Sequence, residues 1–126
     1  MIDANASVAD THRPQNEGQH VQRVYKSAMQ ISSAVTFHNS PEAFMDESDY
    51  RVTAENREKL FHSWARYWNA SAQVLIEKSP RHITMTRFLQ AMFSRDKSRF
   101  LFILRHPFGC KYAWGYAGYE QAISMS

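Results

Sequence analysis

Two short stretches decide the fold of this chain: residues 74–80, VLIEKSP, and residues 100–107, FLFILRHP. Each stretch begins with consecutive apolar residues and ends in a polar turn that proline closes. Continuous rather than alternating hydrophobicity over so short a run is typical of a strand buried on both faces, as in a parallel sheet. Residues 85–93, MTRFLQAMF, lie between the two runs and place apolar side chains at helical spacing. We therefore expect a right-handed parallel βαβ unit.

Two further helices are predicted on either side of this unit. Thr53 can cap a helix that carries an apolar face, and Phe108 begins a second set of aromatic residues at helical spacing. The first face comprises Leu60, Phe61, Trp64, Tyr67 and Trp68, and the second comprises Phe108, Tyr112, Tyr116 and Tyr119. The order from residue 53 is thus α-β-α-β-α, which is an α/β fold.

The chain divides at residue 53 into two regions. Residues 1–52 form a variable N-terminal segment, which we expect to be partly disordered over residues 1–20, helical over 20–35 and irregular over 38–50. Only two of the eight phenylalanines, Phe37 and Phe44, precede residue 61, so this segment is expected at the periphery. Residues 53–126 form the partial α/β domain.

The composition of the chain indicates which classes of ligand or partner it is suited to bind. The 126 residues are 44% hydrophobic and carry a formal charge of +3, with lysine and arginine spread along the chain rather than in a block. This distribution favours a small anionic ligand and disfavours nucleic acid. The longest apolar run is far shorter than the roughly 20 residues that cross a bilayer, so no membrane segment is expected.

No metal site is expected either. Cys110 is the single cysteine, and His62, His82 and His106 lack the close spacing of metal ligands.

Cationic side chains follow both predicted strands. Ligands of open parallel sheets bind beyond the carboxyl ends of the strands, where the chain turns into the next helix. Lys78 follows the first strand and Arg105 follows the second, so we expect both cations at one edge of the sheet. The sequence therefore predicts a phosphate or sulfonate site there.

In this order and at these spacings, the motifs resemble the sulfotransferase family. The similar branch carries an EKSP-type turn, then RFLQALF, then an RHP or RDP turn, and residues 64–68 (WARYW) are similar as well. The resemblance covers roughly residues 53–118. It implies a partial P-loop-like parallel sheet flanked by helices. It also implies metal-free transfer of a sulfonate from 3′-phosphoadenosine 5′-phosphosulfate (PAPS) to an unidentified hydroxyl or amine acceptor, which leaves 3′-phosphoadenosine 5′-phosphate (PAP).

The resemblance assigns a role to each cation. It implies that Arg105 binds the 3′-phosphate of the donor, for which a guanidinium is suited because its donors match two phosphate oxygens. It implies that Lys78 is catalytic, because an ammonium fixed at the transfer site would stabilise negative charge in the transition state. The alternatives are an exposed arginine that pairs with a carboxylate or caps a helix, and a solvated lysine on a surface turn.

The sequence leaves two roles possible for each of the other polar residues of the first turn. Ser79 either donates a hydrogen bond at the site or only shapes the turn before proline. Glu77 is either a general base or, as we prefer, the partner of a nearby arginine such as Arg81 or Arg87.

The sequence departs from the family pattern in two places. No loop of the Pro-Arg-Ser-Gly-Thr type, which holds the 5′-phosphosulfate, precedes residue 53, and Gly18 lies in a polar stretch with no predicted strand before it. Eight positions after Arg105, where the family usually has serine, this chain has Ala113. We therefore expect the chain alone to be inactive and to bind donor poorly or not at all.

Two alternative functions follow from these departures. The first is a non-catalytic interaction domain derived from the sulfotransferase fold. The second is a relative of P-loop nucleotide kinases, which the missing Gly-x-x-x-x-Gly-Lys-Ser/Thr motif disfavours.

Overall fold

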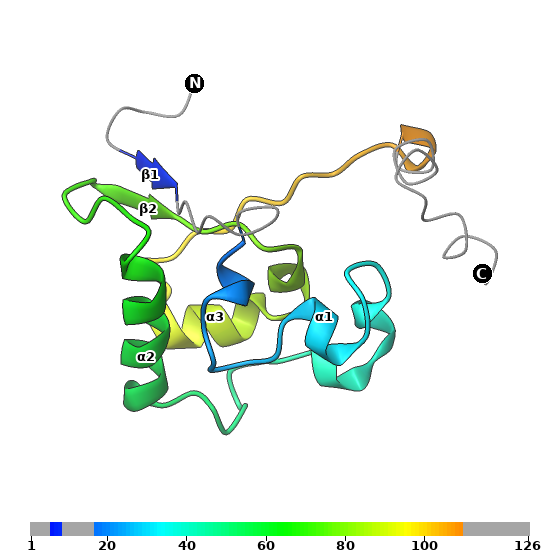
Figure 1. The fold of residues 1–126 in the computed structure, drawn as a ribbon, viewed down its shortest axis with the longest axis horizontal. Coiled ribbons are helices and arrows are strands. Elements are labelled where there is room, and N and C mark those ends of the chain that lie inside the picture. Colours follow the sequence, from blue (N-terminus) through cyan, green and yellow to red (C-terminus); the bar gives the residue numbers. More distant parts are fainter. Residues whose placement is uncertain (1–5, 9–16, 110–126) are drawn as a thin grey trace.

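The fold is helix-rich and contains little strand. A computed structural model describes residues 6–8 and 17–109 (Figure 1). The elements in chain order are β1 (Ala6–Val8), the 3-10 turn η2 (Gly18–His20), α1 (Ala28–Ile31), the 3-10 turns η3 (Phe37–Asn39) and η4 (Pro41–Ala43), α2 (Ala54–Ala65), β2 (Val74–Ile76), the 3-10 turn η5 (Pro80–Thr84) and α3 (Thr86–Phe93).

The described residues contain one small sheet. It has two parallel strands, with Ser7 of β1 in register with Leu75 of β2. A partial P-loop-like parallel sheet flanked by helices, which was predicted from residue 53 onward, is therefore not supported by this part of the chain. The only parallel partner of β2 seen here precedes residue 53, where no strand was expected.

Three predicted elements are confirmed. The Thr53 hydroxyl accepts a hydrogen bond from Asn56 N (3.1 Å), so it caps α2 as expected. The run Val74–Ile76 is strand β2, and the apolar stripe of residues 85–93 becomes α3. Local signals, a cap and an apolar period, were sufficient for these elements.

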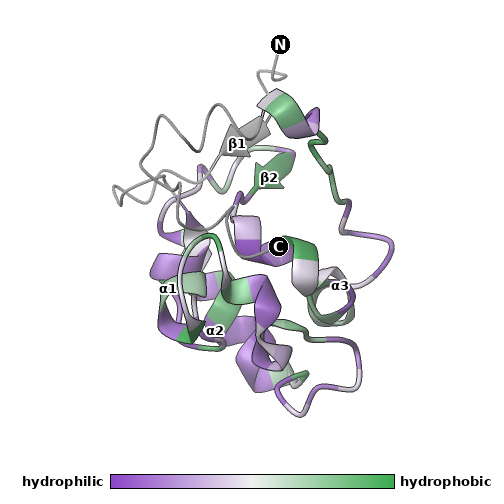
Figure 2. Cartoon of the chain, turned by 90° about the vertical axis from the view of Figure 1, so that its right-hand side faces the viewer, coloured by the Kyte–Doolittle hydropathy of each residue, from purple (hydrophilic) through white to green (hydrophobic). Residues whose placement is uncertain are grey.

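The second predicted strand, over residues 100–104, is wrong. Residues 101–106 belong to no strand or helix, and residues 101–104 are all exposed. After α3 the chain turns at Ser94, whose φ of 67° is positive, and then runs away from the sheet (Figure 1). Figure 2 shows this apolar segment standing off the body of the chain. Because a strand needs a neighbour, an apolar run that leaves the sheet has no pairing to define it. The helix predicted from Phe108 falls mostly outside the described residues, of which 107–109 are helical.

One main hydrophobic core unites both parts of the chain. Its buried members are Tyr25, Met45, Leu60, Trp64, Met85, Phe88, Leu89 and Met92. Tyr25 and Met45 come from the N-terminal segment, whereas most of the others lie on α2 and α3. The expectation that the first fifty residues are peripheral is therefore wrong for these two side chains.

Arg81 holds the N-terminal segment to the turn before α3. Its side chain is fully buried, and Nε donates to the carbonyl of Lys26 (2.6 Å) while Nη1 donates to that of Ala43 (2.7 Å). Its guanidinium carbon also lies 5.7 Å from the centroid of the Tyr25 ring. Burial lowers the pKa of this guanidinium, but the carbonyl oxygens and the ring compensate the desolvated charge.

Replacing this arginine should destabilise the fold strongly. We expect Arg81→Met to lower the free energy of unfolding by about 3 kcal/mol or more, because hydrogen bonds from a charged donor contribute roughly 1.5–3 kcal/mol each. Urea unfolding followed by tryptophan fluorescence measures this change. The matched control is Arg87→Met, since Arg87 is exposed and pairs with exposed Glu47. Equal unfolding midpoints for the two variants would contradict the role of Arg81.

Candidate functional site

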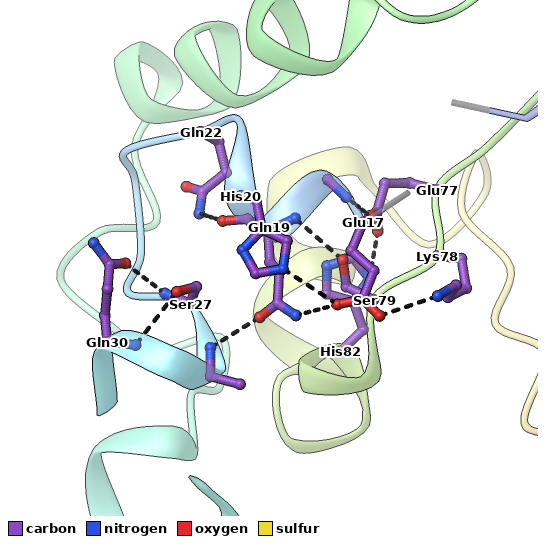
Figure 3. Close-up of polar contacts among 12 residues, drawn as sticks. Glu17, Gln19, His20, Gln22, Ser27, Gln30, Glu77, Lys78, Ser79 and His82 are labelled. Carbon is purple, nitrogen blue, oxygen red and sulfur yellow. Dashed lines mark hydrogen bonds and ion pairs between the residues drawn. The ribbon is translucent and has the colours of Figure 1, made fainter. Parts of the chain in front are cut away.

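The candidate site is the turn that follows β2, together with the segment that covers it. Parallel strands place their carboxyl ends at the same edge of a sheet. Residues 77–80 leave β2 at this edge, and residues 17–19 lie against them (Figure 3). The two segments are joined by three polar contacts: Gly18 N to Glu77 Oε1 (2.6 Å), Gln19 N to Ser79 Oγ (3.1 Å) and Lys78 Nζ to Glu17 Oε1 (3.0 Å).

Glu77 is the centre of this arrangement. Its side chain is only 6% exposed, and Oε1 accepts a second hydrogen bond from Ser79 Oγ (2.7 Å). Its other oxygen, Oε2, lies 2.8 Å from His82 Nδ1, and His82 Nε2 lies 3.0 Å from the Tyr25 hydroxyl. The prediction that Glu77 pairs with Arg81 or Arg87 is therefore wrong, because its partner is a histidine.

These contacts set the protonation of the buried groups. Burial alone would raise the pKa of Glu77, but hydrogen bonds and charge from His82, with hydrogen bonds from Ser79 and Gly18 N, hold it below its ordinary value. The pKa of Tyr25 is well above its ordinary value, first because of burial and then because of the Glu77 charge. At neutral pH the site thus contains a carboxylate beside a neutral phenol. A buried carboxylate with a lowered pKa, one oxygen of which already accepts two hydrogen bonds, is a poor general base.

The two predicted cations are not brought together. Lys78 lies at the carboxyl end of β2 as expected, with its side chain 58% exposed. Arg105 is exposed in the segment after α3 and follows no strand. Figure 1 shows that segment running away from β2, so the expectation that both cations share one edge of the sheet is not met.

The three histidines that were considered as metal ligands lie in three different places. His62 is exposed on α2, His82 belongs to the Glu77 network, and the ring of His106 stacks on Phe108 with centroids 5.5 Å apart. In the described ranges, no group of three or more His, Cys, Asp or Glu side chains could hold a metal ion. Cys110 and Ala113 fall outside these ranges. None of the helices described there is long and apolar enough to cross a membrane.

Sequence reasoning missed the N-terminal half of the site. Glu17, Gly18 and Gln19 were assigned to a disordered or loosely attached leader, yet all three are buried against the turn. Gly18 was noted, but without a strand before it, whereas β1 precedes it in the chain. The one available signal was the isolated glycine, since a close approach between two segments requires a residue without a side chain.

No protein-family model matches this chain, and no curated protein or solved structure matches it either. The similarity to sulfotransferases consequently depends on the motifs of residues 53–118 alone. The geometry of the turn after β2 is the observation from which a function can be argued.

A side chain at position 18 should disrupt the site. A Cβ there would lie 2.5 Å from Glu77 Oε1 and 2.6 Å from Trp64 Nε1, so the two segments must separate. We expect Gly18→Ala to lower the thermal unfolding midpoint by several degrees, as differential scanning calorimetry would measure. The control is Gly109→Ala, since a Cβ at position 109 meets no atom within 4 Å. The close approach would be refuted if both variants melted at the wild-type temperature.

The lowered pKa of Glu77 makes stability depend on pH in a defined direction. A carboxyl whose pKa is lower in the folded chain stabilises it above the unfolded pKa, about 4.3 for glutamate, and this contribution is lost as the pH falls through the folded pKa. We expect Glu77→Gln to be less stable than wild type at pH 7 and to lose less stability between about pH 5 and pH 3. Urea unfolding at several pH values measures both effects, and parallel pH profiles for the two proteins would contradict this assignment.

Proposed function

We propose that this chain carries part of a sulfotransferase, which transfers a sulfonate group from PAPS to a hydroxyl or amine acceptor. The observation that supports this proposal is the position of Lys78. Its neighbours Glu77 and Ser79 are held in buried hydrogen bonds, whereas the Lys78 side chain is 58% exposed at the carboxyl end of β2, with its ammonium paired to Glu17. A fixed cation at this edge of a parallel pair of strands is suited to an anionic group of a ligand.

The proposed chemistry needs the cation more than it needs a base from this turn. The acceptor oxygen or nitrogen attacks sulfur, the bond from sulfur to the bridging oxygen of the donor breaks, and PAP leaves while the acceptor gives up its proton to solvent. Negative charge on the sulfonate and bridging oxygens would be stabilised by the ammonium of Lys78. Glu77 would contribute by fixing the turn, since its own oxygens are engaged.

Binding of the donor's 3′-phosphate by Arg105 requires residues 100–104 to join the sheet in the donor-bound protein. Two observations support this part of the proposal. These residues are consecutively apolar and residues 101–104 are exposed, so a place in a sheet would bury them. The stretch from residue 77 to residue 99 is also long enough for a parallel crossover, which takes about a dozen residues or more. Arg105 would then lie at the same edge as Lys78.

The second candidate function is a non-catalytic interaction domain. The exposed side chains of residues 101–104 favour it, with Leu101 and Leu104 respectively 89% and 91% exposed. An apolar stretch of this kind on a chain surface is typical of a contact with another protein.

Titration with PAP tests the proposed function. We expect weak binding by the 126-residue chain and an affinity at least about tenfold lower for Arg105→Ala, which corresponds to about 1.4 kcal/mol of binding free energy. We expect Lys78→Ala to weaken binding as well. Arg99→Ala is the matched control, because Arg99 is another exposed arginine of the same segment, and it should bind like wild type. Isothermal titration calorimetry measures these affinities.

Two results would count against the sulfotransferase. Unchanged affinity in Arg105→Ala would remove the role of this arginine, and unchanged affinity in Lys78→Ala would favour the interaction domain, because the cation at the carboxyl end of β2 would then take no part in binding PAP. A transfer assay with labelled PAPS completes the test, in which we expect no product from the chain alone.

A further inference from the structure

The carboxylate of Glu17 is surrounded by donors although it lies beside the exposed end of Lys78. Its side chain is only 7% exposed. One oxygen, Oε1, lies 3.0 Å from Lys78 Nζ, and the other, Oε2, accepts a hydrogen bond from Gln19 Nε2 and lies 3.5 Å from His20 Nε2 (Figure 3). An ammonium, an amide and an imidazole thus converge on one anion.

Contacts other than those with Glu17 fix the Gln19 amide and the backbone of Lys78. The side-chain oxygen of Gln19 accepts a hydrogen bond from Ala28 N (2.9 Å), which orients the amide so that its NH₂ group faces Glu17. The backbone N of Gln19 is held by Ser79 Oγ (3.1 Å). Lys78 lies between Glu77 and Ser79, which are both held in the buried network. The Gln19 amide and the backbone of Lys78 are therefore expected to keep their places if the carboxylate is removed.

Donors arranged in this way suit a tetrahedral oxyanion. The two oxygens of a carboxylate stand in for two oxygens of a sulfate or phosphate group, which accepts charge-assisted hydrogen bonds from the same kinds of donor. We propose that Lys78, Gln19 and His20 form an oxyanion site that Glu17 fills from within the chain, so that a sulfate or phosphate group must displace Glu17 to reach Lys78. This inference rests on the proposed function for the identity of the natural ligand, and it adds an internal inhibitor of that site.

If Glu17 occupies the oxyanion site, removing its carboxylate should raise the affinity of the site for sulfate or phosphate. A ligand binds only the fraction of molecules whose site is open, so its apparent dissociation constant is the intrinsic constant divided by that fraction. An attached carboxylate competes at a high effective concentration and keeps the open fraction small. Removing the carboxylate takes away this competitor and also removes a negative charge that repels the incoming anion.

The test is a titration of the full chain with inorganic sulfate, followed by the NMR signal of the Gln19 side-chain amide. We expect Glu17→Ala to bind sulfate at least about tenfold more tightly than wild type, and Lys78→Ala in the same background to return the affinity to the wild-type level. The matched control is Glu55→Ala, which also removes a glutamate that pairs with a lysine, Lys59, at 2.6 Å, but on the surface of α2. This control should bind sulfate like wild type.

Equal sulfate affinities for wild type and a folded Glu17→Ala would overturn the proposal. If Glu17→Ala fails to fold, Glu17→Gln decides the matter, because it removes the charge and keeps the shape. An affinity for sulfate that does not rise in this variant would equally overturn the proposal.

Parallel titrations with PAP separate this inference from the proposed function. Suppose that Glu17→Ala binds sulfate more tightly than wild type, but that neither protein binds PAP more tightly than sulfate. The proposal that Glu17 fills the oxyanion site is then supported, and the proposed sulfotransferase function is rejected. Suppose instead that Arg105→Ala weakens PAP binding, and that wild type and Glu17→Ala bind sulfate equally tightly. The proposed function is then supported, and the proposal that Glu17 inhibits the site is rejected.

Discussion

The structure depends on one buried carboxylate, that of Glu77. A buried carboxylate is very costly unless it is paired and hydrogen-bonded. Here Gly18 N and Ser79 Oγ donate to Oε1, and His82 Nδ1 lies 2.8 Å from Oε2. The first of these donors is 59 residues away in the chain, so satisfying the charge holds the N-terminal segment against the end of β2. Four residues later, Arg81 is a buried cation that is satisfied by acceptors: its guanidinium donates hydrogen bonds to the backbone carbonyls of Lys26 and Ala43. Two buried charges in one turn thus attach the N-terminal segment to the β2–α3 region.

This constraint also determines what the turn can do chemically. Of residues 77–79, Glu77 and Ser79 have side chains that are buried in the hydrogen-bond network, and only the Lys78 side chain is mostly exposed. The motif EKSP is therefore primarily a structural device in this chain, and it fixes the backbone of the lysine at the edge of the sheet. The neighbouring Glu17 then decides whether the ammonium meets an external anion or an internal one. Any function assigned to this edge must account for that acid.

The sequence was sufficient where local signals determine structure and insufficient where distant partners do. The capping Thr53 and the apolar stripe of residues 85–93 predicted α2 and α3, and Val74–Ile76 predicted β2. Strand β1 was missed because Ala6–Val8 has three residues and one β-branched side chain, and its partner lies 68 residues later. Residues 100–104 were assigned to a strand because continuous hydrophobicity indicates that a strand would be buried, but not that a neighbour is present to pair with it. Glu77 likewise lies beside His82 rather than Arg81 because of distant partners, since the arginine donates to the backbone carbonyls of Lys26 and Ala43.

Under the proposed function, the described state is one in which neither cation is available to a donor nucleotide at the sheet. Lys78 is neutralised by Glu17, and Arg105 is held in a segment that runs away from β2. Both obstacles are conformational rather than chemical, because the side chains themselves are suited to phosphate and sulfonate oxygens. A ligand with two anionic groups would gain from both cations only after displacing Glu17 and drawing residues 100–104 beside β2, and each rearrangement reduces its net binding free energy. The same rearrangements would make binding selective, since an anion with a single charged group can engage Lys78 but gains nothing from moving the segment that carries Arg105.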